Sequence, residues 1–287
     1  FHYGQARWSG RGDFRQPPTS PYGVTNVKIA VVSSTVLPAP CSGYGGLEMV
    51  AYECAKGLAA KGHDVTLIAP TGSQCPGGKL LAFGPPGRIP EKYAYGGYAY
   101  DDDADKDEKG NPKRKRFGGY WPALVEHDVI IDHSWEKHSH LLKMEGTLKA
   151  PILSVFHAPV LGMYQMWPPQ CPGVGSGRVD KPCAVCISED QASHLRALFP
   201  TDVRVAYNGA DTEVYKPLGI PRSDRFLFLA RYSRIKGAAL AIEACLKAGV
   251  GLDLIGDTTI THEPEYFHHC MKLAKQSSPD WDKNKGN

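Results

Sequence analysis

The most constraining feature of this sequence is a strand–helix–strand pattern close to its start. The short apolar run at residues 27–32 is typical of a strand buried on both faces of a parallel sheet. A helix with one apolar face is expected at about residues 47–61, and Gly62 suits the position just after its end. Residues 63–69 then predict a second strand. Two strands joined through a helix form a right-handed parallel crossover, so the pattern predicts an α/β fold.

The same alternation continues downstream and predicts a large first domain. Further strands are expected at residues 129–131, 152–156, 184–187 and 203–206. A helix is expected at residues 189–198, with Ser188 as its N-cap. Together these elements predict one complete, doubly wound Rossmann-like domain over residues 24–217.

The remaining residues, 218–287, are predicted to form only the beginning of a second Rossmann-like domain. They contain strands at 226–230 and 252–255 and a helix at 237–248, followed by a polar tail. Two strands are too few for an independent domain of this kind. Such a unit would expose apolar sheet edges and faces, so we expect other protein segments or partners to cover it.

Two polar segments stand apart from these units. Residues 1–23 are rich in Gly, Arg, Gln and Pro without periodicity, which predicts an extended N-terminal arm that is disordered or laid on a partner. Residues 96–116 predict a charged insertion, in which an acidic run turns into a basic one. The formal net charge of +3 gives no basis for a nucleic-acid partner. No apolar run reaches the roughly 20 residues that cross a bilayer, so no transmembrane segment is expected.

The eight cysteines invite a metal or redox interpretation, because Cys183 and Cys186 form a CxxC pair. However, Cys186 lies in an apolar run that predicts a strand. Residues three apart on a strand point to opposite faces, so the pair is not expected to share a metal. We predict unpaired thiols, no metal site and a reducing, cytoplasmic compartment, although the start of the chain does not reveal its localisation.

Residues suited to chemistry follow the predicted strands. The loop after the first strand contains Gly43, Tyr44, Gly45, Gly46 and Glu48. Open α/β sheets bind ligands at the carboxyl ends of their strands, and glycines let a ligand approach the backbone. A plain tight turn would show the same glycines. His133 and His157 each follow a later strand, so both would face one crevice, either as ligand-binding or as structural residues.

Two cations in the second unit form the most specific pattern. Arg231 follows the strand at 226–230, and Lys236 stands just before the next helix. With the N-terminus of that helix, both could converge on a diphosphate; ordinary surface cations are the alternative. Asn208 and Gly209 lie in the segment that leads into this unit.

In order and spacing, these segments resemble the family 4 glycosyltransferases. The Gly-Tyr-Gly-Gly-Leu-Glu loop is similar to their acceptor-side loop, residues 207–211 to their P-N-G-V-D segment, and residues 231–237 to their G-R-x-x-x-x-K-G segment. The resemblance covers about residues 27–276. It implies the GT-B fold, in which two Rossmann-like domains face a cleft, with the acceptor mostly on the first and the nucleotide sugar mostly on the second.

The resemblance also implies roles for individual residues. Arg231 and Lys236 match the pair that holds the donor diphosphate and stabilises the leaving nucleoside diphosphate, where other folds use a divalent metal. No metal and no cofactor beyond the nucleotide-sugar donor is therefore implied. His157 matches a histidine of the donor-sugar pocket, and transfer to an acceptor hydroxyl would retain anomeric configuration by front-face attack. We predict His157, Arg231 and Lys236 as catalytic, and Gly43, Tyr44, Gly45, Gly46, Glu48, His133, Asn208 and Gly209 as substrate-binding.

The sequence departs from the family pattern in one serious respect. The family's glutamate pair in an E-x7-E motif, which contacts the sugar and the nucleotide ribose, has no match in these 287 residues. Two interpretations stay open: a retaining glycosyltransferase whose remaining part is missing from this chain or supplied elsewhere, and a non-catalytic domain that serves as a structural or binding subunit. A dinucleotide-dependent oxidoreductase is not supported, because the G-x-G-x-x-G fingerprint is lacking.

Overall fold

The computed structural model describes residues 26–82, 86, 121–134, 139, 143, 148–158, 183–198, 203–219, 221, 223–258 and 263–277. The predicted arm at 1–23 and the predicted insertion at 96–116 lie outside these described residues. The first unit consists of β1 (Lys28–Val32), α1 (Gly46–Ala60), β2 (Asp64–Ala69), β3 (Lys79–Ala82), α2 (Trp121–Leu124), β4 (Val129–Asp132), β5 (Ile152–Phe156), β6 (Cys183–Cys186), α5 (Glu189–Leu198) and β7 (Val203–Val205). The second consists of β8 (Arg225–Leu229), η2 (Arg234–Lys236), α6 (Ala238–Ala248), β9 (Gly251–Ile255) and α7 (Pro264–Ser277).

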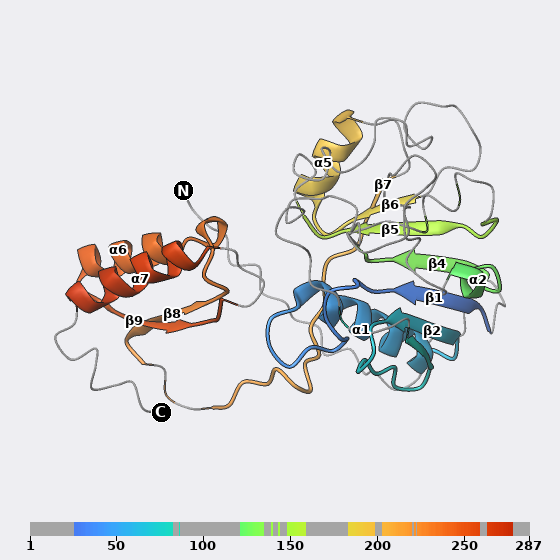
Figure 1. Ribbon diagram of the computed structural model, residues 1–287, viewed down its shortest axis with the longest axis horizontal. Helices are drawn as coiled ribbons and strands as arrows, with labels where there is room; N and C mark the ends of the chain where they lie inside the picture. The colour runs from blue at the N-terminus through green and yellow to red at the C-terminus, as the bar shows by residue number, and fades with distance from the viewer. Residues whose placement is uncertain are drawn as a thin grey trace, which may run out of the picture.

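The first unit is built on one parallel sheet of seven strands, in the order β3-β2-β1-β4-β5-β6-β7 (Figure 1). The chain first adds strands on one side of β1 and then on the other, so the strand order reverses between β1 and β4. In open α/β sheets this reversal opens a crevice at the carboxyl ends of the two strands, where ligands bind. The predicted α/β fold is confirmed.

Both faces of this sheet are buried, which explains why its strands are apolar runs. On β1, Ile29 and Val31 pack in the cluster that includes buried residues of α1, whereas Ala30 and Val32 pack in the cluster that includes Leu124 of α2. Alternate residues of a strand point to opposite faces. A strand that is covered on both sides therefore has apolar residues on both of its faces and reads as a nearly continuous apolar run.

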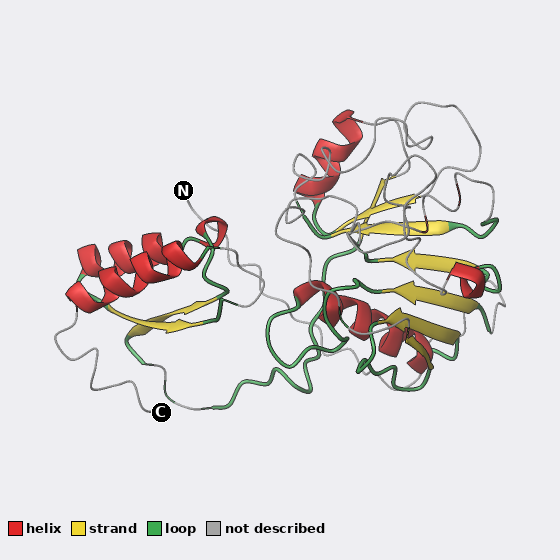
Figure 2. Cartoon of the chain, in the orientation of Figure 1, coloured by secondary structure: helices red, strands yellow, loops and turns green. Residues whose placement is uncertain are grey.

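The second unit is a two-stranded parallel sheet, β8-β9, with α6 and α7 on one face (Figure 2). Its core contains Tyr232, Ile242, Tyr266, Cys270 and Ala274. The prediction of a polar tail after the last strand was wrong in part, because α7 occupies residues that were assigned to it. Tyr266, Cys270 and Ala274 are spaced by four and therefore form one buried helical stripe, although most other residues of α7 are polar.

The first unit also contains two elements that the sequence pattern did not predict, β3 and α2. The strand β3 has only four residues, and its Leu80 is 39% exposed. It pairs along β2 at the edge of the sheet, where burial on both faces is not required. Its apolar run, Leu80 to Ala82, is too short to predict a strand from the sequence.

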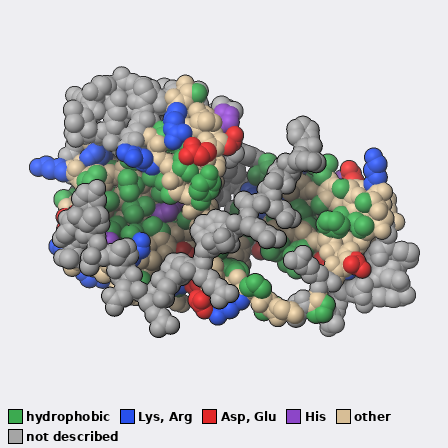
Figure 3. Space-filling model, turned by 180° about the vertical axis from the view of Figure 1, so that it is seen from behind, with side chains coloured by type: hydrophobic (Ala, Val, Ile, Leu, Met, Phe, Trp, Pro, Cys, Tyr) green, Lys and Arg blue, Asp and Glu red, His purple; other side chains and the backbone are tan. Residues whose placement is uncertain are grey.

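The face of the β8-β9 sheet opposite the helices is apolar and open. Leu227, Leu229 and Ile255 are 59%, 69% and 53% exposed. Figure 3 shows apolar side chains at the surface of this unit. The expected exposure of an apolar sheet face is thus confirmed, and its coverage by other protein segments stays a prediction.

Candidate active site

The two predicted histidines meet at the carboxyl ends of neighbouring strands. His133 directly follows β4 and His157 directly follows β5, and these strands pair with Asp132 opposite Ser154. The Nδ1 atom of His133 lies 3.0 Å from the Nε2 atom of His157. The rings stack with their centroids 5.2 Å apart. The expected proximity of the two histidines is confirmed, whereas the crevice and their roles toward a substrate stay predictions.

A buried aspartate fixes the loop that carries His133. The carboxylate of Asp132 is fully buried and accepts hydrogen bonds from the backbone N–H of Ser134 at 2.9 Å and from its hydroxyl at 2.6 Å. The hydroxyl of Ser139 donates to the second carboxylate oxygen. These bonds hold the chain on both sides of His133, which is itself 3% exposed. Sequence reasoning did not single out Asp132, because an acid at a strand end gives no signal of its partners.

The glycine loop after β1 is held tightly by its own side chains. The thiol of Cys41 donates to the carbonyl oxygen of Gly45 at 3.3 Å and to that of Gly43 at 3.6 Å. A Cβ atom at Gly45 would lie 2.3 Å from the Cys41 sulfur, and the φ angle of Gly45 is +154°. Only glycine fits this position. Burial, and then the nearby Glu48 carboxylate, raise the pKa of the Cys41 thiol, so it stays a hydrogen-bond donor at neutral pH.

Glu48 turns inward rather than toward solvent. It is 5% exposed, and its carboxylate accepts a hydrogen bond from the hydroxyl of Ser34 just after β1. That hydroxyl also accepts the backbone N–H of Val36 at 3.2 Å. The contact with Ser34 thus makes Glu48 an internal support of the loop, and a direct contact with substrate stays a prediction. Gly43 and Gly46 of the same loop are exposed.

In the second unit, backbone hydrogen bonds fix the position of Arg231. Past the ends of β8 and β9, the N–H of Ala230 donates to the carbonyl oxygen of Ile255 at 3.1 Å, and that of Tyr232 donates to the carbonyl oxygen of Asp257 at 3.0 Å. The two segments approach so closely that a Cβ atom at Gly256 would lie 1.9 Å from the Ala230 oxygen. Arg231 therefore stands between two anchored neighbours.

The glycine loop of the first unit reaches this arginine. The guanidinium carbon of Arg231 lies 5.1 Å from the centre of the Tyr44 ring. A Cβ atom at Gly43 would lie 4.0 Å from a carboxylate oxygen of Asp257. The Nε atom of Arg231 is buried and has no hydrogen-bond partner in the part of the chain that the structure describes. The glycine loop of the first unit and the first predicted cation therefore meet across the two units.

Lys236 and the segment before the second unit are more open. Lys236 ends η2 and is exposed, without an ion pair to any described residue, and Gly237 adopts φ +76° before α6. Asn208 and Gly209 are also exposed. The segment that carries them is tied back to α1, because the ammonium group of Lys56 lies 2.6 Å from the Asp211 carboxylate. Among described residues, no hydrogen bond joins the histidine pair to either predicted cation.

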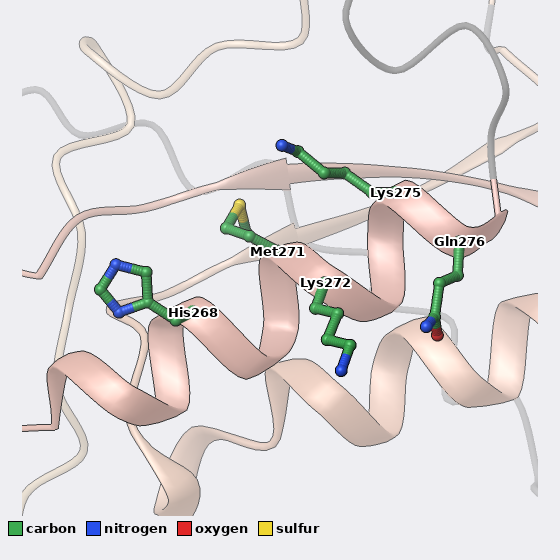
Figure 4. A pocket seen from close by; sticks show the side chains of 5 residues that line it. All are labelled: His268, Met271, Lys272, Lys275 and Gln276. Atoms are coloured by element: carbon green, nitrogen blue, oxygen red, sulfur yellow. The ribbon is translucent and has the colours of Figure 1, made fainter.

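Other site types find little support in the described residues. No group of three or more His, Cys, Asp or Glu side chains among them could hold a metal ion. Cys186 is buried in a core cluster and Cys183 is outside it, and burial raises the pKa of Cys186 to about 11. None of the described helices is long and apolar enough to span a membrane. A hollow on α7 (Figure 4) contains none of the predicted site residues; it is lined by His268, Met271, Lys272, Lys275 and Gln276.

Comparisons with known proteins match this architecture. No curated protein sequence matches significantly. Sucrose-phosphate synthase from Thermosynechococcus elongatus has a similar structure, with a TM-score of 0.62 and 18% identity over 89% of this chain and 69% of that chain. AviGT4, a glycosyltransferase involved in avilamycin A biosynthesis, has a TM-score of 0.51 and 21% identity over 88% of this chain and 62% of that chain. HepE from Anabaena, in complex with UDP-glucose, has a TM-score of 0.56 and 13% identity over 88% of this chain and 66% of that chain.

At such identities the structural likeness establishes the fold, which is that of the GT-B glycosyltransferases. The chain spans 62% to 69% of the length of these three proteins. The sequence model described as Glycosyltransferase Family 4 matches residues 44–214, which is more than half of the chain and extends from Tyr44 past β7. This chain therefore belongs to glycosyltransferase family 4.

Proposed function

We propose that this chain acts as a retaining glycosyltransferase, which moves a sugar from a nucleoside-diphosphate sugar to an acceptor hydroxyl. One observation carries the proposal: the Tyr44 ring of the acceptor-side loop lies 5.1 Å from the guanidinium of Arg231. Two segments far apart in the sequence thus meet where both sheets present the carboxyl ends of their strands. The nucleotide sugar in the HepE structure, which shares the fold, supports this class of donor.

In this proposal, Arg231 and Lys236 hold the donor diphosphate. The buried Arg231 Nε atom has no partner among the described residues, and Lys236 is exposed without an ion pair to any of them. Both cations are therefore available for charge-assisted hydrogen bonds to phosphate oxygens. Negative charge grows on the diphosphate as the sugar leaves, so fixed cations stabilise the transition state more than the bound donor. The two cations take the role that a divalent metal has elsewhere, and the nucleotide sugar is the only cosubstrate required.

The histidine pair would bind the transferred sugar. The 3.0 Å contact between His133 and His157 requires one proton between two ring nitrogens, so one imidazole donates and the other accepts. This fixes the orientation of the His157 ring, which is the more exposed of the two. A half-buried imidazole at the end of β5 is suited to a hydrogen bond with a sugar hydroxyl. Deprotonation of the acceptor hydroxyl is then assigned to the leaving phosphate, on the same face of the sugar.

The acceptor would lie over the glycine loop of the first unit. Gly43 and Gly46 are exposed, and Gly46 begins α1, whose first backbone N–H groups have no intrahelical partner. Glycines let an acceptor approach these groups closely. Asn208 and Gly209 are proposed to contact the substrate from the segment between the units.

Nucleotide binding tests the proposal directly. Isothermal titration calorimetry of the 287-residue chain with UDP, GDP and ADP should show saturable binding of one of them. Lys236→Ala should weaken that binding about 10- to 150-fold, because one charge-assisted hydrogen bond contributes about 1.5–3 kcal/mol. Lys247→Ala is the matched control, since Lys247 is an exposed lysine in the last turn of α6, at the far end of the helix that follows Lys236. A folded chain that binds no nucleotide, or equal affinities for Lys236→Ala and wild type, would contradict the proposal.

A further inference from the structure

Arg231 differs from its neighbours in the kind of partner that it has. In the same unit, Arg225 and Arg234 each form an ion pair with an acidic side chain, at 2.7 Å and 3.5 Å. Within the described residues, Arg231 forms no ion pair, and its guanidinium lies against the ring of Tyr44 from the other unit. The contact with Tyr44 therefore holds this side chain without neutralising its charge.

The chemistry of the two kinds of partner is different. A carboxylate binds the N–H groups at the edge of a guanidinium and cancels its charge. An aromatic ring attracts the guanidinium through its negative face and uses none of those N–H groups. An arginine held by a ring is thus fixed in orientation and still able to bind an anion. A phosphate group, which accepts two parallel N–H bonds, fits this arrangement.

Both sides of the contact are held by their own surroundings. Tyr44 precedes Gly45, whose carbonyl accepts the Cys41 thiol and whose backbone fits only glycine. Arg231 lies between Ala230, which is hydrogen-bonded to the last residue of β9, and Tyr232, which is hydrogen-bonded to the segment after β9. A contact between two anchored segments restricts the arginine far more than a contact between two mobile side chains.

We propose that Tyr44 is the positioning residue for Arg231, and that its ring turns the guanidinium N–H groups toward the diphosphate of the donor. The inference rests on the function proposed above and adds a regulation of the same site. Tyr44 belongs to the acceptor-side loop, whereas Arg231 binds the donor. Any acceptor that displaces the Tyr44 ring therefore changes the affinity for the nucleotide, and the reverse holds as well.

Nucleotide binding by variants of Tyr44 tests this inference. Tyr44→Leu should weaken binding of the nucleoside diphosphate about 3- to 30-fold, the range expected for losing a partly desolvated cation–π contact. Tyr44→Phe keeps the ring face and should bind within about 2-fold of wild type. Tyr52→Leu is the matched control: it removes a tyrosine from α1 whose ring faces the Lys56 ammonium at 5.9 Å, without touching Arg231. This control should leave affinity unchanged.

A double-mutant cycle separates positioning from a direct or purely structural role. If Tyr44 acts through Arg231, Tyr44→Leu has no further effect once Arg231→Ala is present. If Tyr44→Leu lowers the nucleotide affinity equally in the wild-type and the Arg231→Ala backgrounds, the inference is overturned. It is also overturned if Tyr44→Leu binds nucleotide with wild-type affinity while Arg231→Ala binds it weakly. In either case the proposed function stands. Failure of the wild-type chain to bind any nucleoside diphosphate would instead overturn the proposed function, and the role of Tyr44 with it.

Discussion

Gly256 offers a sharp test of how the second unit holds its arginine. Replacing it by alanine adds one methyl group, whose carbon would lie 1.9 Å from the carbonyl oxygen and 2.8 Å from the carbonyl carbon of Ala230. Real Cβ contacts essentially never fall below 3.0 Å, so the two segments must separate by more than 1 Å. The obstructing atoms belong to the backbone and cannot rotate away. The segments that follow β8 and β9 must therefore move apart as a whole.

The size of the effect follows from what this movement breaks. The hydrogen bonds from Ala230 to Ile255 and from Tyr232 to Asp257 flank the site at 3.1 Å and 3.0 Å. Each contributes about 1 kcal/mol, and overpacking costs about 1–3 kcal/mol. We expect the free energy of local opening to fall by about 3–5 kcal/mol. Amide hydrogen exchange around Gly256 should then accelerate by a factor of about 150 or more, since about 1.4 kcal/mol is a factor of ten.

Hydrogen exchange measured by mass spectrometry can locate this effect. Peptides covering residues 225–232 and 251–257 should exchange faster in Gly256→Ala, whereas a peptide covering β1 should not. The control is Gly57→Ala, because a Cβ atom at Gly57 in α1 would meet nothing within 4 Å. That change should stabilise the helix by about 0.5–1 kcal/mol. If exchange at 225–232 is the same in Gly256→Ala and wild type, the close approach does not constrain Arg231 and our reasoning is wrong.

Two further predictions concern the first unit. Lys56→Met should raise the pKa of Asp211 toward its ordinary value, because the hydrogen bond from Lys56 is the main cause that lowers it. The folded-state pKa of Asp211 lies below the unfolded one. The stability that this pair contributes is therefore complete above the ordinary aspartate pKa and disappears as the pH falls through the lowered value. A carbon-13 NMR titration of the Asp211 carboxylate that finds equal pKa values in Lys56→Met and wild type would contradict this prediction. Ser188→Ala should destabilise the protein by about 1 kcal/mol in urea denaturation, because the Ser188 hydroxyl accepts a hydrogen bond from the Gln191 N–H at 3.1 Å and caps α5. An unchanged urea midpoint would contradict this prediction and show that water replaces the cap.

Most of the first unit could be predicted from sequence because burial dictates its pattern. A strand covered on both faces is apolar at most positions, and β1, β2 and β5 show this pattern. The signal weakens where burial is partial. The helix α7 was not placed from sequence for this reason, since it buries only a narrow stripe between histidines and lysines. The edge strand β3 was not predicted because its apolar run is only three residues long.

The site could be predicted only as far as local chemistry is visible in the sequence. Equivalent positions after two neighbouring strands predicted that His133 and His157 meet, and they do, at 3.0 Å. The inward turn of Glu48 toward Ser34 was not visible, because an acid in the first turn of a helix usually faces solvent and its sequence position does not reveal a buried partner. The need for glycine at position 256 depends on a backbone atom of another strand end. Such contacts exist only once the strands are paired.

The geometry of α1 explains how the two units can act together. Beyond its N-terminus, Tyr44 contacts Arg231. Toward its other end, Lys56 binds Asp211 in the segment that leads into the second unit. Gly46 and Lys56 are about 15 Å apart along the helix, at 1.5 Å per residue. Two contacts at separate points along one helix restrict the orientation of the second unit as well as its distance from the first. A ring-face contact tolerates small shifts better than the short ion pair between Lys56 and Asp211 does. The ion pair therefore serves as the fixed point, and Tyr44 serves as the adjustable one.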